Sequence, residues 1–483
     1  MSETTDLLVV GAGPAGLAAA VTAADHGLRV MLVDAGPQPG GQYWRHPDER
    51  YPVADESAGH HGWKVLTKLR DRLRVHRGAG HIDYRPGTQV WFIEAPKTES
   101  SPWYVYTTAS VEAQPDHVPT GSVRAMRIVL CPGGYDRQLP VPGWDLPGVM
   151  AAGGVQALLK GSRTLAGRRA VVAGTGPFLL PVAVGLAEAG AEVVAICEAG
   201  NLTGWAKNVT GAVQVPSKGV EGAEYAKALV KHRIPYKTST AVTRIDGDGQ
   251  VQSAVLTALD RRGRPRSGSE RAVEVDLVAF GWGFTPSMEL VQAVGAETRI
   301  GSDESLIAVV DDMQRSTASR VYIAGEATGV GGAMMAVAEG ELAGLGAAGD
   351  NGSSIDGARV RKLRGIIRRS AAFAQAMHHA HPVPARWTDW LTEDTLVCRC
   401  EEVTYAQVCH ARDDLSADEA RSVKILARPG MGWCQGRVCG FACAKIAAAN
   451  EDRDLSPDDL ARMSKRSLAT PVSLEDLADL TLE

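Results

Sequence analysis

Six of the eight cysteines in this 483-residue chain fall between Cys398 and Cys443. Four of them form two close pairs, Cys398-Arg399-Cys400 and Cys434-Gln435-Gly436-Arg437-Val438-Cys439. Such clustering favours a metal group over disulfides. Two irons with two thiolates each need four cysteines from two loops, and glycines around the second pair let backbone N–H groups approach the sulfurs. The pattern predicts a [2Fe–2S] cluster on Cys398, Cys400, Cys434 and Cys439, with tetrahedral zinc as the alternative.

The stretch between the two cysteine pairs must bring their loops together. It reads as a short amphipathic helix followed by a strand-like segment, Val423–Ala427. Cys409 and Cys443 are left out of the predicted ligand set, because Cys443 follows Cys439 by one helical turn and suits an apolar helix position.

A second kind of chemistry is indicated by Asp6–Ala35, which reads as strand, glycine turn, helix and strand. In a Gly-x-Gly-x-x-Gly turn of this kind, Gly11 permits the sharp turn, Gly13 lets the backbone approach a pyrophosphate and Gly16 lets the helix pack closely. The helix begins at Pro14-Ala15 and directs its free N–H groups at the phosphates. Asp34, before Ala35, ends the second strand and can accept hydrogen bonds from a ribose hydroxyl. The stretch predicts a bound dinucleotide.

The loop Gly36–Gln42 follows directly and is too rich in glycine and proline for regular structure. We expect Gly40, Gly41 and Gln42 to lie near the cofactor, with an ordinary surface turn as the alternative.

Two later segments read as strands that end in glycine turns. Arg127–Val149 contains Pro132-Gly133-Gly134, and Ser319–Gly344 contains Gly325-Glu326 followed by a glycine-rich turn and a helix from Ala333. Gly332 would let the start of that helix face a flavin ring, where N–H dipoles stabilise negative charge. Cys131 has no second cysteine at redox spacing, so we expect it in the core.

A second nucleotide-type unit spans Arg169–Ala199, with Gly174 and Gly176 in its turn. Leu179 occupies the third glycine position, where a side chain would force helix and strand apart. A nicotinamide site, a retained scaffold and a site for another nucleotide are therefore all open interpretations.

The charge and hydropathy of the chain argue against a nucleic-acid-binding protein and against a membrane-spanning one. The net charge is −5 and the basic residues are scattered, so no nucleic-acid partner is expected. The uncharged run Leu7–Ala24 lacks a basic leader and is explained by the nucleotide fold, so no membrane span is expected and the cytoplasm is the predicted location. A basic segment, Arg361–Arg369, is predicted to form a helix whose charged face is in solvent; the alternative is that this face binds a partner. His378, His379 and His381 read as linker histidines.

The order of these motifs, with the LPVPGWDLPGVM segment and the CRCEEVT and GMGWCQGRVCG cysteine motifs, resembles the α subunit, also called the A subunit, of heteromeric amino-acid and opine dehydrogenases. That group includes octopine and nopaline oxidases, D-hydroxyproline dehydrogenase, the flavin subunit of hydrogen cyanide synthase and part of heterotetrameric sarcosine oxidase. The match covers nearly the whole chain. It departs from such flavoproteins where Cys131-Pro132 replaces Ala-Thr and where Glu326 replaces an Asp that contacts the ribityl chain.

The resemblance implies an α/β flavoprotein with two dinucleotide-binding domains, similar to glutathione reductase, and a small C-terminal [2Fe–2S] domain of the bacterioferritin-associated-ferredoxin type. The implied divisions are an FAD-binding domain in two parts (1–145 and 285–360), an inserted NAD(P)-binding-like domain (146–284), a linker (361–390), the cluster domain (391–455) and a tail (456–483). The expected cofactor contacts are Gly11, Gly13, Pro14, Ala15, Gly16, Asp34, Ala35, Gly40, Gly41, Gln42, Gly133, Gly325, Glu326 and Gly332.

The resemblance further implies that an FAD-containing β subunit oxidises the amine, with a small third subunit as an optional member of the complex. This chain would receive the electrons through an FMN at the subunit interface and the [2Fe–2S] cluster, and its FAD would pass them to an external acceptor. No residue of this chain is predicted to be catalytic. The alternatives are a stand-alone NAD(P)H-dependent reductase of a protein acceptor and a non-enzymatic assembly subunit.

Overall fold

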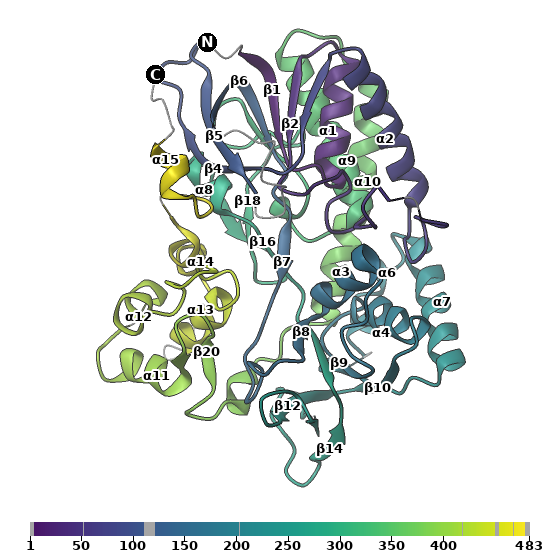
Figure 1. The fold of residues 1–483 in the computed structure, drawn as a ribbon, viewed down its shortest axis with the longest axis vertical. Helices are drawn as coiled ribbons and strands as arrows, with labels where there is room; N and C mark the ends of the chain where they lie inside the picture. Colours follow the sequence, from purple (N-terminus) through teal and green to yellow (C-terminus); the bar gives the residue numbers. More distant parts are fainter. Residues whose placement is uncertain are drawn as a thin grey trace.

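The computed structural model describes residues 4–51, 53–110, 121–201, 203–417, 419–449, 454–466 and 468–478. Two α/β units and a smaller, mostly helical module make up the chain (Figure 1). In that view the first unit lies at the top, the second at the lower right and the helical module at the lower left.

The first sheet is built around β1, the strand that the first glycine turn follows. In order, its strands are β3 (Ile82–Arg85), β2 (Val30–Val33), β1 (Thr5–Val10), β6 (Gly121–Leu130), β5 (Trp103–Ala109) and β4 (Thr88–Glu94). The pairs from β3 to β6 are parallel, and β5 and β4 continue antiparallel. β6 pairs with β5 through its first half and in parallel with β19 (Val321–Ile323) through its last residues. The chain therefore returns to its first sheet more than three hundred residues after leaving β1.

Small residues let the first helix and the returning helix approach closely. α1 (Pro14–Asp25) packs against α9 (Ala333–Asp350). A methyl group added to Gly340 would lie 1.9 Å from the carbonyl oxygen of Ala15, and one added to Gly344 would lie 2.6 Å from that of Ala19. α2 (Trp63–Gly78) packs on α1, and α10 (Gly357–Ala380) packs on α9.

The second unit is a parallel sheet with its own covering helices. Its strands, in order, are β11 (Tyr236–Thr238), β10 (Glu192–Glu198), β9 (Arg169–Gly174), β15 (Leu277–Gly281) and β8 (Val149–Ala151). Its helices are α3 (Ala152–Ser162), α4 (Leu179–Glu188), α5 (Thr203–Lys207), α6 (Val209–Ala212) and α7 (Pro216–His232). An antiparallel sheet of β12 (Thr240–Asp246), β13 (Ser253–Ala258) and β14 (Arg271–Glu274) precedes β15. The expected strand, helix and strand of Arg169–Ala199 are all present.

Two paired crossing strands join the units. β7 (Gly134–Asp136) and β16 (Phe284–Pro286) run antiparallel, with Phe284 opposite Asp136. The chain thus leaves and re-enters the first unit at one place. It continues through α8 (Glu289–Ala293), β17 (Thr298–Ile300) and β18 (Leu306–Ala308) before reaching β19.

The helical module carries the clustered cysteines. Its elements are β20 (Leu396–Cys398), β21 (Val403–Thr404), α11 (Tyr405–Asp413), α12 (Ala420–Ala427), α13 (Gly440–Ala448) and α14 (Pro457–Ser464). α14 packs against α12 and α13, so the packed module continues past residue 455. α10 takes up most of the stretch 361–390 that leads to it, including the predicted basic helix Arg361–Arg369, and the short η2 (Trp387–Trp390) follows.

The predicted strand Val423–Ala427 is wrong, because these residues form the second half of α12. Ala420 and Val423, which are three positions apart in the sequence, are both buried, while Ile425 is exposed. This spacing is typical of a helix that buries one face. β-branched residues favoured a strand locally, but burial against α11, α13 and α14 decides the conformation.

After α14 the chain returns to the first unit. The backbone N–H of Ala469 donates to the carbonyl of Trp91 on β4 at 2.7 Å, and α15 (Leu474–Ala478) follows. The end of the predicted leucine-bearing tail, residues 479–483, lies outside the described residues. In the part of the chain that the structure describes, no helix combines the length and the apolar character needed to cross a bilayer.

Candidate functional site

The first glycine turn has the geometry that the sequence predicted. Gly11 has φ +98°, and a methyl group on it would lie 2.2 Å from the carbonyl oxygen of Cys131. A methyl group on Gly16 would lie 1.7 Å from the carbonyl oxygen of Gly11. For a methyl group on Gly13, the nearest atom would be the Cα of Gly41, 3.9 Å away. Gly11 and Gly16 are thus required by packing, whereas Gly13 faces space that a ligand can use.

Asp34 closes the other side of this turn. Its carboxylate accepts hydrogen bonds from the backbone N–H groups of Ala12 and Gly36. Ala35 follows, and its carbonyl accepts from the hydroxyl of Ser110 at 2.5 Å. The carboxylate therefore lies beside the turn at the start of α1, where a ribose hydroxyl would meet it.

The glycine loop lies on the first turn, as expected. The backbone N–H of Gly40 donates to the carbonyl of Ala12 at 2.9 Å, and a methyl group on Gly41 would lie 2.8 Å from the Cα of Gly13. Gln42 points elsewhere, since its side-chain oxygen accepts from Arg45 at 3.0 Å and the residue is exposed. Only the two glycines, and not Gln42, are held against the turn.

The later glycines reach the same place. Gly325 has φ +83°, and a methyl group on it would lie 3.1 Å from the Cβ of Ala15 in the first turn of α1. Gly332, with φ +87°, precedes α9, and Gly133, with φ +69°, directly precedes the crossing strand β7. A methyl group on either would have no neighbour within 4 Å. The first turn thus contacts three other segments: the glycine loop at Gly41, the end of β6 at Cys131 and the turn at Gly325. Such a convergence is what a bound dinucleotide requires.

Acidic side chains gather at this convergence. Oε2 of Glu326 would lie 3.1 Å from a methyl group on Gly134, so the glutamate contacts the crossing strand β7. Burial raises the pKa of Glu326 to about 7, and the nearby carboxylates of Asp136 and Asp303 add to the effect. Glu326 is therefore an acid that can hold a proton near neutral pH.

Sequence reasoning missed a second acid, Glu339 on α9. Its side chain is buried, its Oε2 accepts from the backbone N–H of Gly325 at 2.8 Å, and burial raises its pKa to about 8. The available signal was a carboxylate in the otherwise apolar start of this helix, AMMAVAEG. Buried acids of this kind are common at functional sites.

The second unit accommodates Leu179 differently from our expectation. Leu179 is fully buried, and it occupies the space that a side chain on Gly281 of β15 would need: a methyl group there would lie 2.9 Å from its Cδ2. Helix and strand are therefore not forced apart. Beside the turn, the buried carboxylate of Glu198 accepts from the backbone N–H of Gly176 at 2.8 Å and from the hydroxyl of Thr175 at 3.0 Å.

The four predicted cluster ligands lie close together. The thiol of Cys398 is hydrogen-bonded to that of Cys439, which raises the pKa of Cys398, and Cys439 also contacts Cys443. Burial raises the pKa of Cys400, and its contact with the thiol of Cys434 adds to the effect. Cys398 and Cys439 are buried, whereas Cys400 is exposed. A methyl group on Gly432 would lie 2.4 Å from the Cβ of Cys400, so the loop approaches closely only because it carries glycine.

Among the described residues, no three His, Cys, Asp or Glu side chains form a group that could hold a single metal ion. A binuclear cluster needs two thiolates on each iron, which two pairs can supply, whereas a structural zinc needs four ligands on one ion. The [2Fe–2S] cluster and the zinc alternative therefore both stay predictions for these four cysteines. The backbone N–H of Gly430 also points at Sγ of Cys398, 3.5 Å away.

Buried charges hold the cysteine loop against the first unit. Oε1 of Glu289, on α8, lies 2.9 Å from Nε of Arg437 and 3.3 Å from Nη1 of Arg466. Arg466 also donates to the carbonyl of Gln435, next to Cys434. The loop that carries the second cysteine pair is therefore fixed relative to α8, which directly follows the crossing strand β16.

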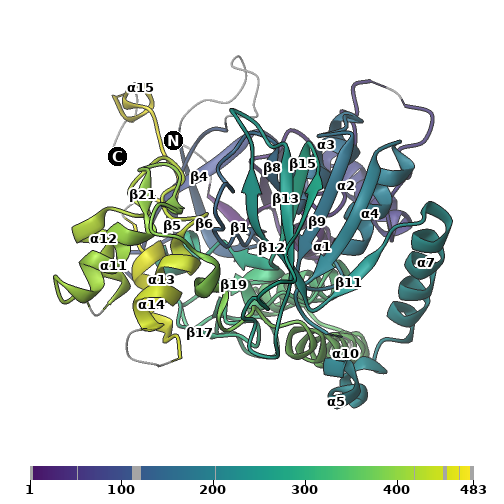
Figure 2. The same ribbon diagram turned by 90° about the horizontal axis from the view of Figure 1, so that it is seen from below.

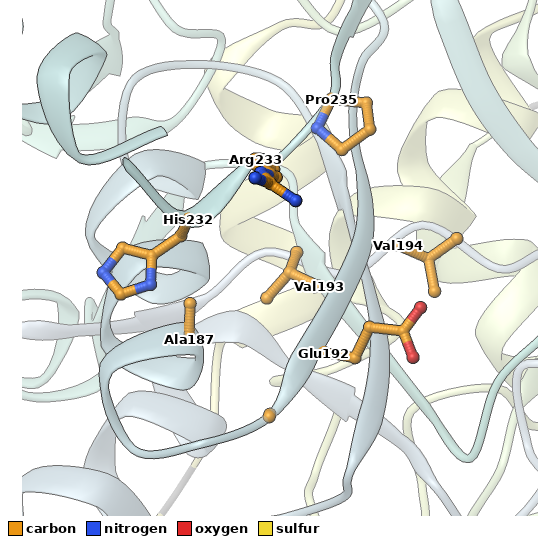
Figure 3. A pocket seen from close by; sticks show the side chains of 8 residues that line it. Ala187, Glu192, Val193, Val194, His232, Arg233 and Pro235 are labelled. Atoms are coloured by element: carbon orange, nitrogen blue, oxygen red, sulfur yellow. The ribbon is translucent and has the colours of Figure 1, made fainter. Parts of the chain in front are cut away.

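A surface pocket of about 370 Å³ lies elsewhere (Figure 3). It is lined by the end of α4, the start of β10 and the residues after α7, with Glu192, His232 and Arg233 as its charged or titratable members. Glu192 begins β10 and Glu198 ends it, so the pocket opens at the edge of the second sheet opposite the glycine turn. Ligands of open parallel sheets bind at the carboxyl ends of the strands, so this pocket is not the cofactor site.

The geometry of the glycine turns agrees with a comparison of the sequence with known families. Residues 5–340 match the family described as pyridine nucleotide-disulphide oxidoreductase. The chain belongs to this family. Its fold binds FAD or another nucleotide, which accounts for the two nucleotide-type units of this oxidoreductase.

Two relatives match this oxidoreductase over nearly its full length. The A subunit of opine oxidase from Rhizobium meliloti is 31% identical, over 99% of this chain and 88% of the relative. Hydrogen cyanide synthase subunit HcnB of Pseudomonas aeruginosa is 29% identical, over 93% of this chain and 94% of the relative. The predicted resemblance to this group of subunits is confirmed.

A solved structure shows the same fold. L-proline dehydrogenase from P. horikoshii has 19% sequence identity and a TM-score of 0.69, over 99% of this chain and 80% of that one. The predicted α/β fold of the pyridine nucleotide-disulphide oxidoreductase type is thus confirmed.

Proposed function

We propose that this oxidoreductase is the electron-transferring subunit of a heteromeric, cytoplasmic flavin-dependent dehydrogenase that acts on an amine or amino acid of the opine or hydroxyproline type. The observation that carries the proposal is the convergence of four glycine-bearing segments in the same chain as two pairs of cysteines. Oxidation of the amine itself would take place on an FAD-containing partner subunit.

The residues around the first glycine turn would hold FAD. Gly11 and Gly16 shape the turn, Gly13 and Gly41 leave room for the pyrophosphate, and Asp34 would accept from the ribose. Gly133, Gly325, Glu326 and Gly332 would line the space beside the flavin ring. Cys398, Cys400, Cys434 and Cys439 would hold the [2Fe–2S] cluster.

When bound, these groups would accept electrons from the partner's flavin, through an FMN at the subunit interface, and deliver them to an external acceptor. The protein's part is to keep the two sites at a fixed separation. Arg137 supports this, because it is buried, lies with its guanidinium 4.2 Å from the ring centre of Phe441 on α13 and pairs with Asp303 at 3.1 Å. Its neighbour Asp136 belongs to the strand that Glu326 contacts.

The relatives support the substrate class and the partner. One is named as an oxidase of opines and another, by structure, as a dehydrogenase of L-proline, and each of these substrates contains a carbon–nitrogen bond beside a carboxylate. Both sequence relatives are named as subunits. A partner subunit for this chain follows by analogy, with a small third subunit as a further possible member of the complex.

The experiment is to purify the full chain natively, without a partner, and to measure flavin, iron and acid-labile sulfide per chain. The expected result is a yellow-brown protein with one FAD, two irons and two sulfides. A colourless protein without iron would instead support an assembly role, and one zinc per chain would support the alternative metal.

A further inference from the structure

We propose that the second nucleotide-type unit is closed to dinucleotides by this chain's own helix α10, and that the protein therefore does not take electrons from NADH or NADPH. The inference narrows the source of electrons to another donor, such as a partner's reduced flavin. Its first test reads the bound flavin and so rests on the proposed FAD site, but bleaching by a nicotinamide nucleotide would overturn the closure and leave the flavin and cluster assignments standing.

The closure lies where a cofactor would bind. In parallel sheets of this kind the pyrophosphate meets the turn after the first strand, and the ribose meets the acid at the end of the second. Here these positions are Gly174–Gly176, after β9, and Glu198, at the end of β10. Both lie at the carboxyl edge of the sheet.

Glu198 already has all of its partners within the chain. The side chain is fully buried. Besides Thr175 and Gly176, the backbone N–H of Gly200 donates to Oε1 at 2.9 Å. Asp34 of the first unit also accepts from two backbone N–H groups, but it is only half-buried. Glu198 is fully enclosed, so a ribose hydroxyl could reach it only by displacing one of its donors.

His381, at the end of α10, occupies the remaining space. Its Nδ1 lies 3.2 Å from Oε2 of Glu198, and its Nε2 accepts from the indole N–H of Trp205 at 2.8 Å. Its side chain is only 5% exposed. A methyl group on Gly176 would have the Cβ of His381 as its neighbour, at 3.9 Å. The Cβ of His381 therefore lies near the glycine turn, while its ring lies between Glu198 and Trp205.

The contrast with the first unit is direct. There, the neighbour of Gly13 is the backbone of another glycine, Gly41, which presents no side chain to the cofactor position. In the second unit the corresponding neighbour of Gly176 is a histidine held by an indole and a carboxylate. The nearest atom is 3.9 Å away in both units, but Gly13 is half-buried whereas Gly176 is buried, so only the second turn is covered by the chain itself.

The packing of α10 shows that the cover is a fixed part of the fold. A methyl group on Gly204, in α5, would lie 2.7 Å from the Cα of Ala380. One on Gly211, in α6, would lie 2.7 Å from the Cβ of Ala376. Helices α5 and α6 thus contact α10 at a separation that only glycine permits, and Figure 2 shows α5 beside the end of α10. A loosely held flap would not need such close contacts.

The first test mixes the full-length, flavin-loaded protein with NADH or NADPH without oxygen, at about 1 mM, the upper end of common KM values. The expected result is flavin bleaching no faster than that of free FAD mixed with the same nucleotide. Rapid bleaching that saturates with nucleotide concentration would overturn the proposal.

The second test compares His381→Ala with His379→Ala, a matched change at an exposed position of the same helix. Removing the imidazole leaves a cavity beside the buried Glu198 and the indole N–H of Trp205 without its acceptor, so the melting temperature should fall by several degrees. His379→Ala should shift it by less than about 1 °C, as surface changes do. Equal, small shifts in both variants would contradict the assigned role of His381.

Should His381→Ala fail to fold, His381→Gln provides the second variant, because its amide can still donate toward Glu198 and accept from Trp205. It should restore most of the lost melting temperature and still show no nucleotide-dependent bleaching. If NADH or NADPH bleached the wild-type flavin in a saturable way while the His381→Gln protein was stable, the proposal that the second unit is closed to dinucleotides would be rejected.

Discussion

The carboxylate of Glu339 accepts a hydrogen bond from the backbone N–H of Gly325 at 2.8 Å, and this contact joins α9 to the end of β19. Gly325 in turn approaches Ala15 of α1, so one buried acid holds together two of the chain segments to which we assign the FAD site. The contact gives a prediction about pH.

Glu339→Gln should flatten the dependence of stability on pH. Burial raises the folded pKa of Glu339 to about 8, above its unfolded value of about 4.3. The stability that this acid contributes is therefore complete below about pH 4 and is lost as the pH rises toward 8. Thermal unfolding between pH 5 and pH 9 should show a smaller loss of melting temperature in Glu339→Gln than in the wild type. Glu99→Gln, at an exposed position, should behave as the wild type; identical slopes in all three proteins would refute the assignment.

Two glycine substitutions should separate folding from cofactor binding. Gly16→Ala places a methyl group 1.7 Å from the carbonyl of Gly11 and should yield a protein that misfolds or loses flavin altogether. In Gly13→Ala the added methyl group meets no atom closer than 3.9 Å, so the protein should fold normally but bind FAD at least tenfold more weakly, a loss of about 1.4 kcal/mol. Gly78→Ala, in α2, meets no atom within 4 Å and is the control. Equal FAD affinity in Gly13→Ala and Gly78→Ala, by fluorescence titration, would mean that no pyrophosphate approaches Gly13.

Single cysteine changes should divide the module's thiols into two classes. Cys398→Ser or Cys434→Ser should remove most of the iron and sulfide, because each leaves one iron with a single thiolate. Cys409→Ser and Cys443→Ala should retain both, since we place these residues outside the ligand set. Iron analysis by mass spectrometry decides this, and iron retained in Cys398→Ser would exclude the assigned ligands.

The ion pairs of Glu289 with Arg437 and Arg466 should contribute much of the free energy that holds the helical module against the first unit. Glu289 and Arg466 are 5% and 8% exposed, so Glu289→Ala leaves buried positive charge unpaired and should cost about 3–5 kcal/mol. Glu192→Ala breaks a pair of similar length with Arg169 at the surface and should cost less than about 1 kcal/mol. Chemical denaturation measures both. A similar small cost in the two variants would show that the module is held by apolar contacts alone.

The sequence predicted the parts of the site that depend on local geometry. Gly11, Gly13, Gly16 and Asp34 follow from one turn whose glycines have separate steric reasons, and the structure places them together. The convergence of Gly40 and Gly41 on that turn also followed from chain order, since the loop comes directly after the second strand.

Long-range contacts escaped sequence reasoning. His381 was expected in a linker, but it lies against Glu198, 183 positions earlier in the chain, and no local pattern marks that contact. Leu179 was expected to separate helix from strand, and its space is provided by Gly281 on another strand. Val423–Ala427 was predicted as a strand from β-branched residues, although the helical spacing of its buried positions decided the outcome.

The central claim, that this chain carries electrons which another subunit extracts, is tested most directly by anaerobic stopped-flow absorbance of its own flavin after addition of an opine or hydroxyproline. The account predicts no bleaching by either amine with the chain alone, and rapid bleaching once the partner subunit is present. Bleaching of the isolated chain at the rate of the complex would contradict it.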